Sequence, residues 1–445
     1  MSETIKIKKG LDIHLKGEVE GKVVSDTATR LFGIVPDDFP GWKWRLTVRE
    51  GDHVAKGAPL LEDKSGKGMK ITAPVAGTVS EVRRGERRKI EAVVIEKAAD
   101  EDCAQLSVNA SGSRQELVKA LCESGLWALM RQRPYDTVPD PEVMPRDIFV
   151  TSFDSAPLAP ELISASDTEA HKAGLAILAK LTEGKVYLGI RDDANLNSDI
   201  ARVYEFHGPH PAGNVGVQIA NIKPVNKGET VWALDSRTVV RIGRLFTTGE
   251  LDTSAEVAIT GPEVKEPKME KTTVGASLGT LLKGELANPS DDRVISGNVL
   301  TGWKSDPARD FLRWPYRQVT VIREGAHADE FMGWASVSPK KYSVKRSFPA
   351  FLRGLSKPFD FDARIKGGHR AMILSGEYDK VFPFDIYPEF LLKAIMAFDI
   401  DKMEQLGIYE VAPEDFALPE FVDTSKIELQ KVVREGLEKL RNEVG

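Results

Sequence analysis

The segment LTVREGDHVAKGAPLLEDKSGKGMKITAPVAGTVSEVRRGERRKIEAVVIEK (46–97) decides the first part of the fold. Short runs of β-branched residues alternate in it with glycines at Gly51, Gly57, Gly77 and Gly85. Short strands separated by glycine turns at such intervals are typical of a compact all-β unit. The segment therefore predicts a small β domain near the start of the chain.

The same segment resembles the barrel-sandwich hybrid of lipoyl and biotinyl carriers, through the order V-x-x-G-D-x-V-x-x-G-x-x-L followed by A-P-x-x-G-x-V. A carrier has one lysine at the hairpin tip, at a fixed distance before the A-P-x-x-G motif. Gly66 stands at that position, and Lys64 and Lys67 flank it. We therefore expect the fold without the prosthetic group, and a carrier protein stays an alternative.

Further along the chain, strands alternate with helices. Strands are expected at 147–151, 185–190, 202–206, 230–234 and 256–260. Helices are expected from the cap residue Asp167 to about 181 and over 236–247. This alternation predicts a mostly parallel, Rossmann-like sheet.

A linker rich in proline and lysine, 261–271, leads to a small α+β unit that is expected to include 291–302, 318–325 and 331–337. From Pro388 the chain is predicted to be helical, because proline fits the first position of a helix. The last helix is expected over 425–444. Its apolar residues at helical spacing share one face, which predicts burial of Val433, Leu437, Leu440 and Val444.

Length and composition limit the function classes. A chain of 445 residues is long enough for about three domains. Its net charge of −6 argues against nucleic acid, whose phosphates need a basic surface. The two cysteines, Cys103 and Cys122, form no disulfide framework and cannot supply four ligands to an iron–sulfur cluster. No apolar stretch is long enough to span a bilayer, so membrane contact is expected to be peripheral.

A dinucleotide site needs a G-x-G-x-x-G loop between the first strand and its helix, so that backbone N–H groups reach the pyrophosphate. After the strand at 147–151 the chain reads SFDSAPLAP (152–160), which has no glycine. Gly213 and Gly216 come closest but do not make the fingerprint. The Rossmann-like domain is therefore expected to bind neither NADH nor flavin.

His207 and His210 have the H-x-x-H spacing of some zinc sites. They stand around Gly208 and Pro209, and no cysteine or carboxylate flanks them at metal-site spacing. A structural turn is the favoured interpretation and no metal site is predicted. A role as proton donor near a redox ligand stays open.

Five cations fall within seven residues at Arg83, Arg84, Arg87, Arg88 and Lys89. Two interpretations are equally supported. One is a solvated turn. The other is a docking surface for an acidic partner or for anionic lipid headgroups, where each cation near the surface adds about 1 kcal/mol.

Ring and guanidinium side chains come together in LWALMRQRPYDTVP (126–139), at Trp127, Arg131, Arg133 and Tyr135. A quinone needs a flat apolar slot and donors for two carbonyl oxygens. The rings can stack on its faces and an arginine can donate to a carbonyl. The favoured alternative is ordinary helix packing with the arginines in solvent.

Seven segments in a fixed order resemble one family. They are IKIKKGLDI (5–13), FVTSFDSAPLAP (149–160), FHGPHPAG (206–213), GRLFTTGEL (243–251), GASLGTLLKGEL (275–286), DDRVISGNVLTG (291–302) and FMGW (331–334). Together they span most of the chain and resemble the A subunits of the sodium-translocating NADH:quinone reductases.

The resemblance implies an α/β multidomain architecture, through the family's likeness to the flavin-binding subunit of respiratory complex I and to the C subunit of the RNF complex. Four parts are expected. They are a barrel-sandwich hybrid domain (1–100), a Rossmann-like domain without the dinucleotide fingerprint (101–261), a β-grasp domain (262–337), and a linker with a C-terminal helical domain lacking iron–sulfur ligands (338–445). Family members often have a cysteine after F-V near the C-terminus. Asp423 stands there in this chain, so no role of that cysteine carries over.

The resemblance also implies a function. The family's respiratory complex transfers electrons from NADH to a quinone such as ubiquinone, coupled to sodium export. This chain would be a peripheral subunit at the cytoplasmic face of the membrane, bound to the other subunits, which hold the flavins and the iron–sulfur cluster. It would carry no cofactor, and the isolated chain would not be catalytic. Two alternatives stay open, a pure assembly scaffold and an NADH- or flavin-binding electron-input subunit.

Overall fold

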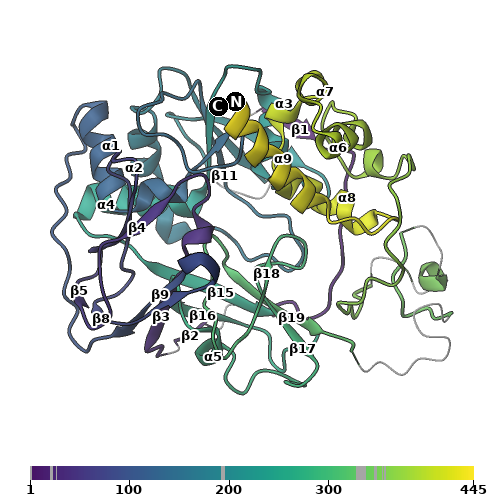
Figure 1. Cartoon of the computed structure of the whole chain (residues 1–445), viewed down its shortest axis with the longest axis horizontal. Coiled ribbons are helices and arrows are strands. Elements are labelled where there is room, and N and C mark those ends of the chain that lie inside the picture. The colour runs from purple at the N-terminus through teal and green to yellow at the C-terminus, as the bar shows by residue number, and fades with distance from the viewer. Residues whose placement is uncertain are drawn as a thin grey trace.

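The computed structural model of the chain describes residues 3–20, 24–26, 28–191, 196–326, 337–344, 348–352, 354 and 357–444. The segment 331–336, expected within the α+β unit, lies outside the described residues. In the described part of the chain, four sheets and a group of C-terminal helices pack together (Figure 1).

One six-stranded sheet forms the α/β part of the molecule. Its strand order is β1 (Glu3–Lys6), β13 (Arg202–His207), β12 (Val186–Ile190), β11 (Ile148–Thr151), β14 (Val231–Asp235) and β10 (Arg131–Arg133). The first five strands run parallel, and β10 is antiparallel to β14. The expected parallel sheet is therefore confirmed. Its edge strand β1 comes from residues that the sequence placed in the β domain.

Side chains of this sheet alternate between two apolar clusters. Ile148 and Val150 of β11 pack in one cluster with helices α2 (Thr168–Leu178) and α4 (Ser236–Thr248), and that cluster continues into α1 (Arg114–Glu123). Phe149 packs in the other cluster, with α3 (Val215–Ile222) and the C-terminal helices. Successive strand residues point to opposite faces, so a strand that is apolar throughout buries both faces.

Two antiparallel sheets form the all-β part, as the glycine-turn spacing predicted. One has the order β3 (Leu31–Ile34), β9 (Ile90–Lys97), β8 (Gly77–Arg84) and β5 (His53–Val54). The other has the order β4 (Trp44–Leu46), β6 (Pro59–Asp63) and β7 (Lys70–Thr72). Gly51 and Gly57 turn the chain with φ of 87° and 85°, a conformation that favours glycine.

The second six-stranded sheet is mixed. Its order is β18 (Trp303–Ser305), β17 (Asp292–Ser296), β19 (Gln318–Arg323), β15 (Ser254–Thr260), β16 (Lys268–Thr273) and β2 (Val24–Asp26), and the short helix α5 (Leu278–Leu281) accompanies it. The expectation that 256–260 extends the parallel sheet is wrong, because β15 pairs with β16 and β19. The physical reason is that the antiparallel strand β10 already occupies the free edge of β14.

The C-terminal part is helical, as predicted, with α6 (Pro388–Ala397), α7 (Ile400–Gln405), α8 (Ala417–Val422) and α9 (Leu429–Val444). Val433, Leu437 and Leu440 are buried on one face of α9, but Val444 is 47% exposed, because the last turn of the helix extends beyond its packing partners. Short 3-10 turns complete the described elements: η1 (Pro36–Asp38), η2 (Glu86–Arg88), η3 (Leu126–Leu129), η4 (Ala165–Asp167), η6 (Pro349–Leu352), η7 (Tyr378–Lys380), η8 (Ile408–Glu410) and η9 (Pro413–Phe416).

Helices α2 and α4 approach each other closely through two glycines. A methyl group at Gly243 would lie 1.7 Å from the carbonyl oxygen of Ala170, and one at Gly174 would lie 2.1 Å from the carbonyl oxygen of Val239. Such distances are far below van der Waals contact and the obstacles are backbone atoms. The close packing of the two helices therefore depends on these glycines.

We predict that Gly243→Ala lowers the free energy of unfolding by about 2 kcal/mol, because overpacking at a helix contact forces the backbones apart. Urea denaturation of the purified chain measures the change. Gly368→Ala is the matched control, since nothing lies within 4 Å of the position of its added methyl group. Equal unfolding midpoints for the two variants would contradict the proposed contact.

Candidate functional site

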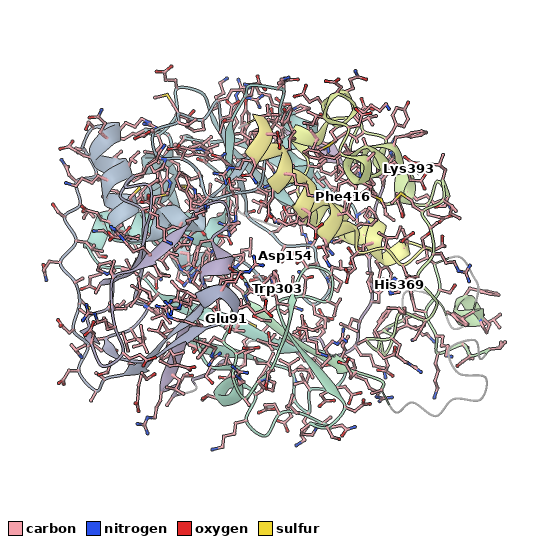
Figure 2. All side chains as sticks on the ribbon, in the orientation of Figure 1. Glu91, Asp154, Trp303, His369, Lys393 and Phe416 are labelled. Carbon is pink, nitrogen blue, oxygen red and sulfur yellow. The ribbon has the colours of Figure 1, made fainter. Side chains whose placement is uncertain are left out.

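A cavity of about 1700 Å³ lies between the parallel sheet, the β domain, the mixed sheet and α9. Each of these parts contributes to its wall, for example through Thr151, Asp38, Tyr316 and Arg434. Figure 2 labels Asp154 and Trp303, which line the cavity and lie near the middle of the molecule in this view. Cavities where several units meet are common ligand sites, so this region is the candidate functional site.

The carboxyl ends of β11 and β14 open into this cavity. Strand β12, which follows β11 along the chain, lies on one side of β11, and β14 lies on its other side. The crevice between the carboxyl ends of β11 and β14 is therefore the switch point of the sheet. Asp154 and Asp235 stand there and both line the cavity. Burial, and to a smaller extent the nearby Asp235, raises the pKa of Asp154. The crevice therefore presents carboxylates where doubly wound folds usually present backbone N–H groups.

A second, narrower cavity of about 70 Å³ adjoins the large one. The two cavities share part of their walls, formed by Asp38, Phe39, Leu129, Trp314 and Tyr316. The remaining wall is mostly apolar and includes Ile34, Ile71, Leu126, Leu251, Val274 and Leu312. We call this narrow cavity the slot. It lies where the β domain, α4 and the mixed sheet meet.

Two residues that line the slot, Arg241 and Trp314, each have one side-chain nitrogen donor without a partner. Nε of Arg241 and Nε1 of Trp314 are buried and form no hydrogen bond within the described part of the chain. The guanidinium of Arg241 lies 4.7 Å from the centre of the Trp314 ring, and its Nη2 donates to the carbonyl oxygen of Ser254 at 2.9 Å. An unpaired buried donor costs about 1–3 kcal/mol. The slot therefore favours a ligand that brings an acceptor oxygen.

Arg241 is 3% exposed, and its pKa is lowered to about 10 by burial and then by the nearby Arg237. Asp252, which also lines the slot, pairs with Arg244 at 2.6 Å and with Arg237 at 3.5 Å. The sequence predicted a helix here and gave no role to Arg241. The signal in the sequence that could have identified it is an arginine on the apolar side of the predicted helix, four residues after Arg237.

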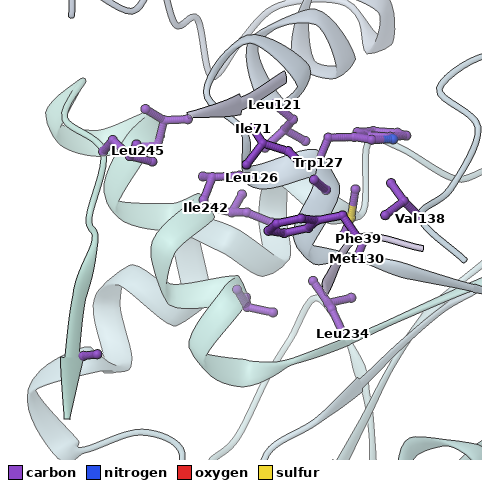
Figure 3. Packing of buried hydrophobic residues seen from close by; sticks show 14 of the residues in the cluster. Phe39, Ile71, Leu121, Leu126, Trp127, Met130, Val138, Leu234, Ile242 and Leu245 are labelled. Atoms are coloured by element: carbon purple, nitrogen blue, oxygen red, sulfur yellow. The ribbon is translucent and has the colours of Figure 1, made fainter. Parts of the chain in front are cut away.

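The four residues predicted to bind quinone do not converge on one slot. Trp127 is 0% exposed, its ring lies edge-on to Trp232 with centroids 4.9 Å apart, and Figure 3 shows it in the core near Met130. Arg131 and Arg133 line the large cavity. Tyr135 packs edge-on against Tyr409, with centroids 6.2 Å apart. The segment instead contributes Leu126 and Leu129 to the slot, and the assignment of the four residues to quinone stays a prediction.

Arg133 holds a buried charge cluster at the wall of the large cavity. Its guanidinium donates to Asp136 at 2.6 Å and to Glu414 at 3.0 Å, and Arg434 bonds Asp136 at 2.7 Å. Asp415 is buried beside Glu414 and accepts from the backbone N–H of Ala412 at 2.8 Å. Burial and the charge of Glu414 raise the pKa of Asp415 to about 8. This cluster is the strongest concentration of linked ionisable groups around the cavity.

The five cations at 83–89 divide into two sets. Arg83 pairs with Glu81 at 3.0 Å, and Lys89 pairs with Asp37 at 2.6 Å. Arg84, Arg87 and Arg88 are exposed, line the large cavity, and have no carboxylate partner in the described residues. Only these three are therefore available to a partner.

Two further candidates from the sequence, Lys67 and His210, are engaged in local contacts. Lys67 at the hairpin tip bonds Asp140 and Glu142, so its amine is not free for a prosthetic group. His210 is buried, its Nδ1 bonds the hydroxyl of Ser155 at 3.0 Å, and burial lowers its pKa to about 4. Cys122 is buried and Cys103 is exposed, both as free thiols.

The described residues offer neither a metal site nor a membrane-spanning helix. Within the ranges given above, no three His, Cys, Asp or Glu side chains gather in a way that could hold a metal ion. In the same part of the chain, none of the helices has the length and apolar composition needed to cross a membrane.

Three family models match the chain. They are the NqrA N-terminal barrel-sandwich hybrid domain over residues 5–98, the NqrA second alpha/beta domain over 112–251, and the NQRA C-terminal domain over 256–306. The first match confirms the barrel-sandwich prediction for the two antiparallel sheets.

Curated relatives match the chain over its full length. The A subunit of the Na(+)-translocating NADH-quinone reductase of Vibrio anguillarum is 41% identical, and the match covers 99% of this chain and 100% of the relative. The corresponding proteins of Saccharophagus degradans and Neisseria meningitidis serogroup B are 38% and 37% identical with the same coverage. A crystal structure of NAD+-reducing [NiFe]-hydrogenase aligns at 12% identity over 76% of this chain and 62% of that chain, with a TM-score of 0.35, too weak a likeness to support an argument.

We predict that Asp415→Asn changes how stability depends on pH. The folded pKa is raised to about 8, above the unfolded value near 3.9, so the folded state holds this proton more tightly. The contribution of this group to stability is therefore full below about pH 4 and is lost as the pH rises to about 8. Asparagine keeps an acceptor oxygen for Ala412 and cannot ionise.

The variant should gain stability over the unmodified chain at about pH 8.5 and show little gain at about pH 4. Urea midpoints at the two pH values measure this. Asp379→Asn, at an exposed position, is the control. An equal effect of Asp415→Asn at both pH values would contradict the raised pKa.

Proposed function

This chain belongs to the NqrA family, the A subunits of the Na+-translocating NADH-quinone reductases, and from that premise we propose that it is a peripheral subunit of such a complex. The complex moves electrons from NADH to a quinone and couples this to sodium export. The chain would bind the other subunits at the cytoplasmic face of the membrane. The observation that carries this proposal is the similarity over the full length of both the chain and its relatives.

We also propose the finer fold assignments. Central parallel strands with helices on both faces support a Rossmann-like domain. The mixed sheet with one short helix, α5, supports a β-grasp domain. Because β15 belongs to the mixed sheet, the boundary between these domains is better placed near Ser254 than at the linker 261–271.

The chain is proposed to carry no nucleotide cofactor. In a dinucleotide site, backbone N–H groups at the switch point receive the pyrophosphate. Here Asp154 and Asp235 stand at the ends of β11 and β14, and their carboxylates would repel phosphate. Flavin and NADH are therefore expected in other subunits of the complex, which disfavours an electron-input role for this chain.

A quinone is the ligand that the slot fits best. Its carbonyl oxygens accept hydrogen bonds, its ring is flat and apolar, and the slot offers apolar walls with two unpaired donors. The slot is about 70 Å³, smaller than the roughly 150 Å³ cavity that accepts benzene. We therefore propose that one carbonyl edge of the ring enters the slot, while the rest of the ring and its tail lie in the large cavity.

In this arrangement Leu129 and Phe39 would contact the ring, and Arg241 and Trp314 would donate to the inserted carbonyl. A cation beside the oxygen would also stabilise the negative charge of a reduced quinone. Arg131 and Arg133 would form part of the wall of the large cavity, next to the tail. Trp127, buried in the core, would hold η3 in place and with it Leu126 and Leu129 in the wall of the slot. Tyr135, packed against Tyr409, would stiffen the turn that follows β10.

We predict that Trp314→Phe raises the apparent KM for quinone of the assembled complex about tenfold. The ring that stacks on Arg241 is kept, while one hydrogen bond worth about 1.4 kcal/mol is lost. NADH oxidation with an artificial electron acceptor should stay normal. Tyr387→Phe is the control, since it also removes one side-chain donor and keeps a ring, while this residue is 69% exposed and lines neither cavity.

The outcome separates two roles for the chain. If Trp314→Phe and Tyr387→Phe both reduce quinone as the unmodified complex does, the quinone site belongs to another subunit. The chain is then an assembly scaffold, which is the second candidate function.

We propose that Arg84, Arg87 and Arg88 dock on an acidic surface of a partner subunit, because they are exposed and unpaired by carboxylates. Changing all three to Glu should leave the folding of the purified chain intact, since surface substitutions cost little. Assembly should weaken, and added salt should weaken assembly of the unmodified chain in the same way. The control reverses Lys119, Lys172 and Lys439, which are also exposed. Equal assembly of both triple variants would count against docking.

A further inference from the structure

Large apolar side chains are exposed mainly in one part of the chain. Among the described residues, fifteen such side chains are exposed, and ten of them lie between Val337 and Met396. A soluble surface normally scatters such residues singly, so this concentration indicates a contact surface.

Several of these residues lie on one flank of the molecule. Tyr387 (69% exposed) and Phe390 (53%) contact each other at the start of α6, with ring centroids 6.2 Å apart. Lys393 lies one helical turn further on the same outward face of α6. Figure 2 shows Lys393 and His369 on this same flank, at the right of the molecule.

The coil before α6 adds aliphatic side chains to the same flank. The carboxylate of Glu389 accepts hydrogen bonds from the backbone N–H of Ser375 at 2.8 Å and of Gly376 at 3.0 Å. These bonds hold Ile373 (59% exposed) and Leu374 (53%) next to the first turn of α6. We call Ile373, Leu374, Tyr387 and Phe390, with the cations Arg370 and Lys393, the C-terminal flank.

This region is basic within an acidic chain. Residues 338–376 contain nine Lys or Arg against two Asp, while the whole chain has a net charge of −6. Both of these acids are engaged: Asp360 pairs with Lys16 at 2.8 Å, and Asp362 pairs with Arg364 at 2.6 Å. Arg370 and Lys393 are exposed and form no ion pair in the described residues. In the described part of this region, Lys340 and Lys357 are likewise exposed and form no ion pair. These four cations outnumber the exposed acids of the neighbouring segment, Asp379 and Asp385, and are available to an anionic surface.

We propose that the C-terminal flank binds an anionic lipid surface, with its rings and aliphatic side chains at the level of the headgroups. Aromatic and aliphatic residues interleaved with cations are typical of peripheral membrane contact. Lysine provides three of the four available cations, Lys340, Lys357 and Lys393, and lysine is depleted at the centre of protein interfaces. Neither cavity described above reaches this flank. The proposal does not depend on the quinone slot.

The full purified chain tests this by co-sedimentation with vesicles of phosphatidylcholine alone and of phosphatidylcholine mixed with phosphatidylglycerol. The chain should bind the mixed vesicles and not the neutral ones, and salt should weaken binding. The double variant Arg370→Glu/Lys393→Glu should bind roughly 30-fold more weakly or worse. Tyr387→Ser/Phe390→Ser should also weaken binding, because the headgroup-level rings are lost.

Matched controls make the same kinds of change elsewhere. Lys119→Glu/Lys172→Glu reverses two exposed charges on α1 and α2, and Val143→Ser/Met144→Ser removes two exposed apolar side chains. Both controls should bind as the unmodified chain does. Absence of binding to mixed vesicles, or equal losses in flank and control variants, would overturn the proposal. Binding through the flank only when the partner subunits are present would also overturn it, and would make the flank a protein interface.

Discussion

Asp38 is the residue on which the arrangement of the molecule depends. Its carboxylate accepts from Nε of Arg313 at 2.7 Å and from the backbone N–H of Trp314 at 3.0 Å, and its carbonyl oxygen accepts from Arg131 at 2.6 Å. One residue of the β domain thus bonds both the mixed sheet and strand β10 of the parallel sheet. Burial raises the pKa of Asp38 to about 6 in spite of Arg313. A buried charge that loses its partner costs about 3–5 kcal/mol, so these contacts fix how the three parts meet.

The slot is a consequence of this junction. Asp38 lies in its wall, and the backbone that Asp38 holds at Trp314 places that indole over Arg241 of α4. The mixed sheet, the β domain and the α/β part each supply one side of the slot, so none of them contains it alone. The same junction leaves a large cavity beside the slot, lined by Asp154 and Asp235 at the switch point and by the charge cluster around Arg133. The two carboxylates disfavour phosphate at the switch point itself, and the slot favours a ligand that brings an uncharged acceptor oxygen such as a carbonyl.

Local patterns in the sequence predicted most elements, because strands, caps and glycine turns depend on neighbouring residues. The parallel strands, α4, α6 and the glycine turns at Gly51 and Gly57 follow from such patterns. Strand β15 was placed in the wrong sheet because the edge of β14 is taken by β10. Strand β10 has only three residues, and its segment of the sequence is typical of a helix and a loop, so it was not predicted. The slot could not be predicted, because its walls come from positions as distant as Ile34 and Tyr316, and its donors are recognisable only by their burial.

The most direct measurement is a density map of the assembled complex with a quinone bound, at a resolution that shows the ring. We expect quinone density beside Leu129 and Phe39, with one carbonyl oxygen within hydrogen-bond distance of Nε of Arg241 or Nε1 of Trp314. The rest of the quinone should extend into the large cavity. Quinone density found only in other subunits, with the slot empty, would contradict the assignment of the slot.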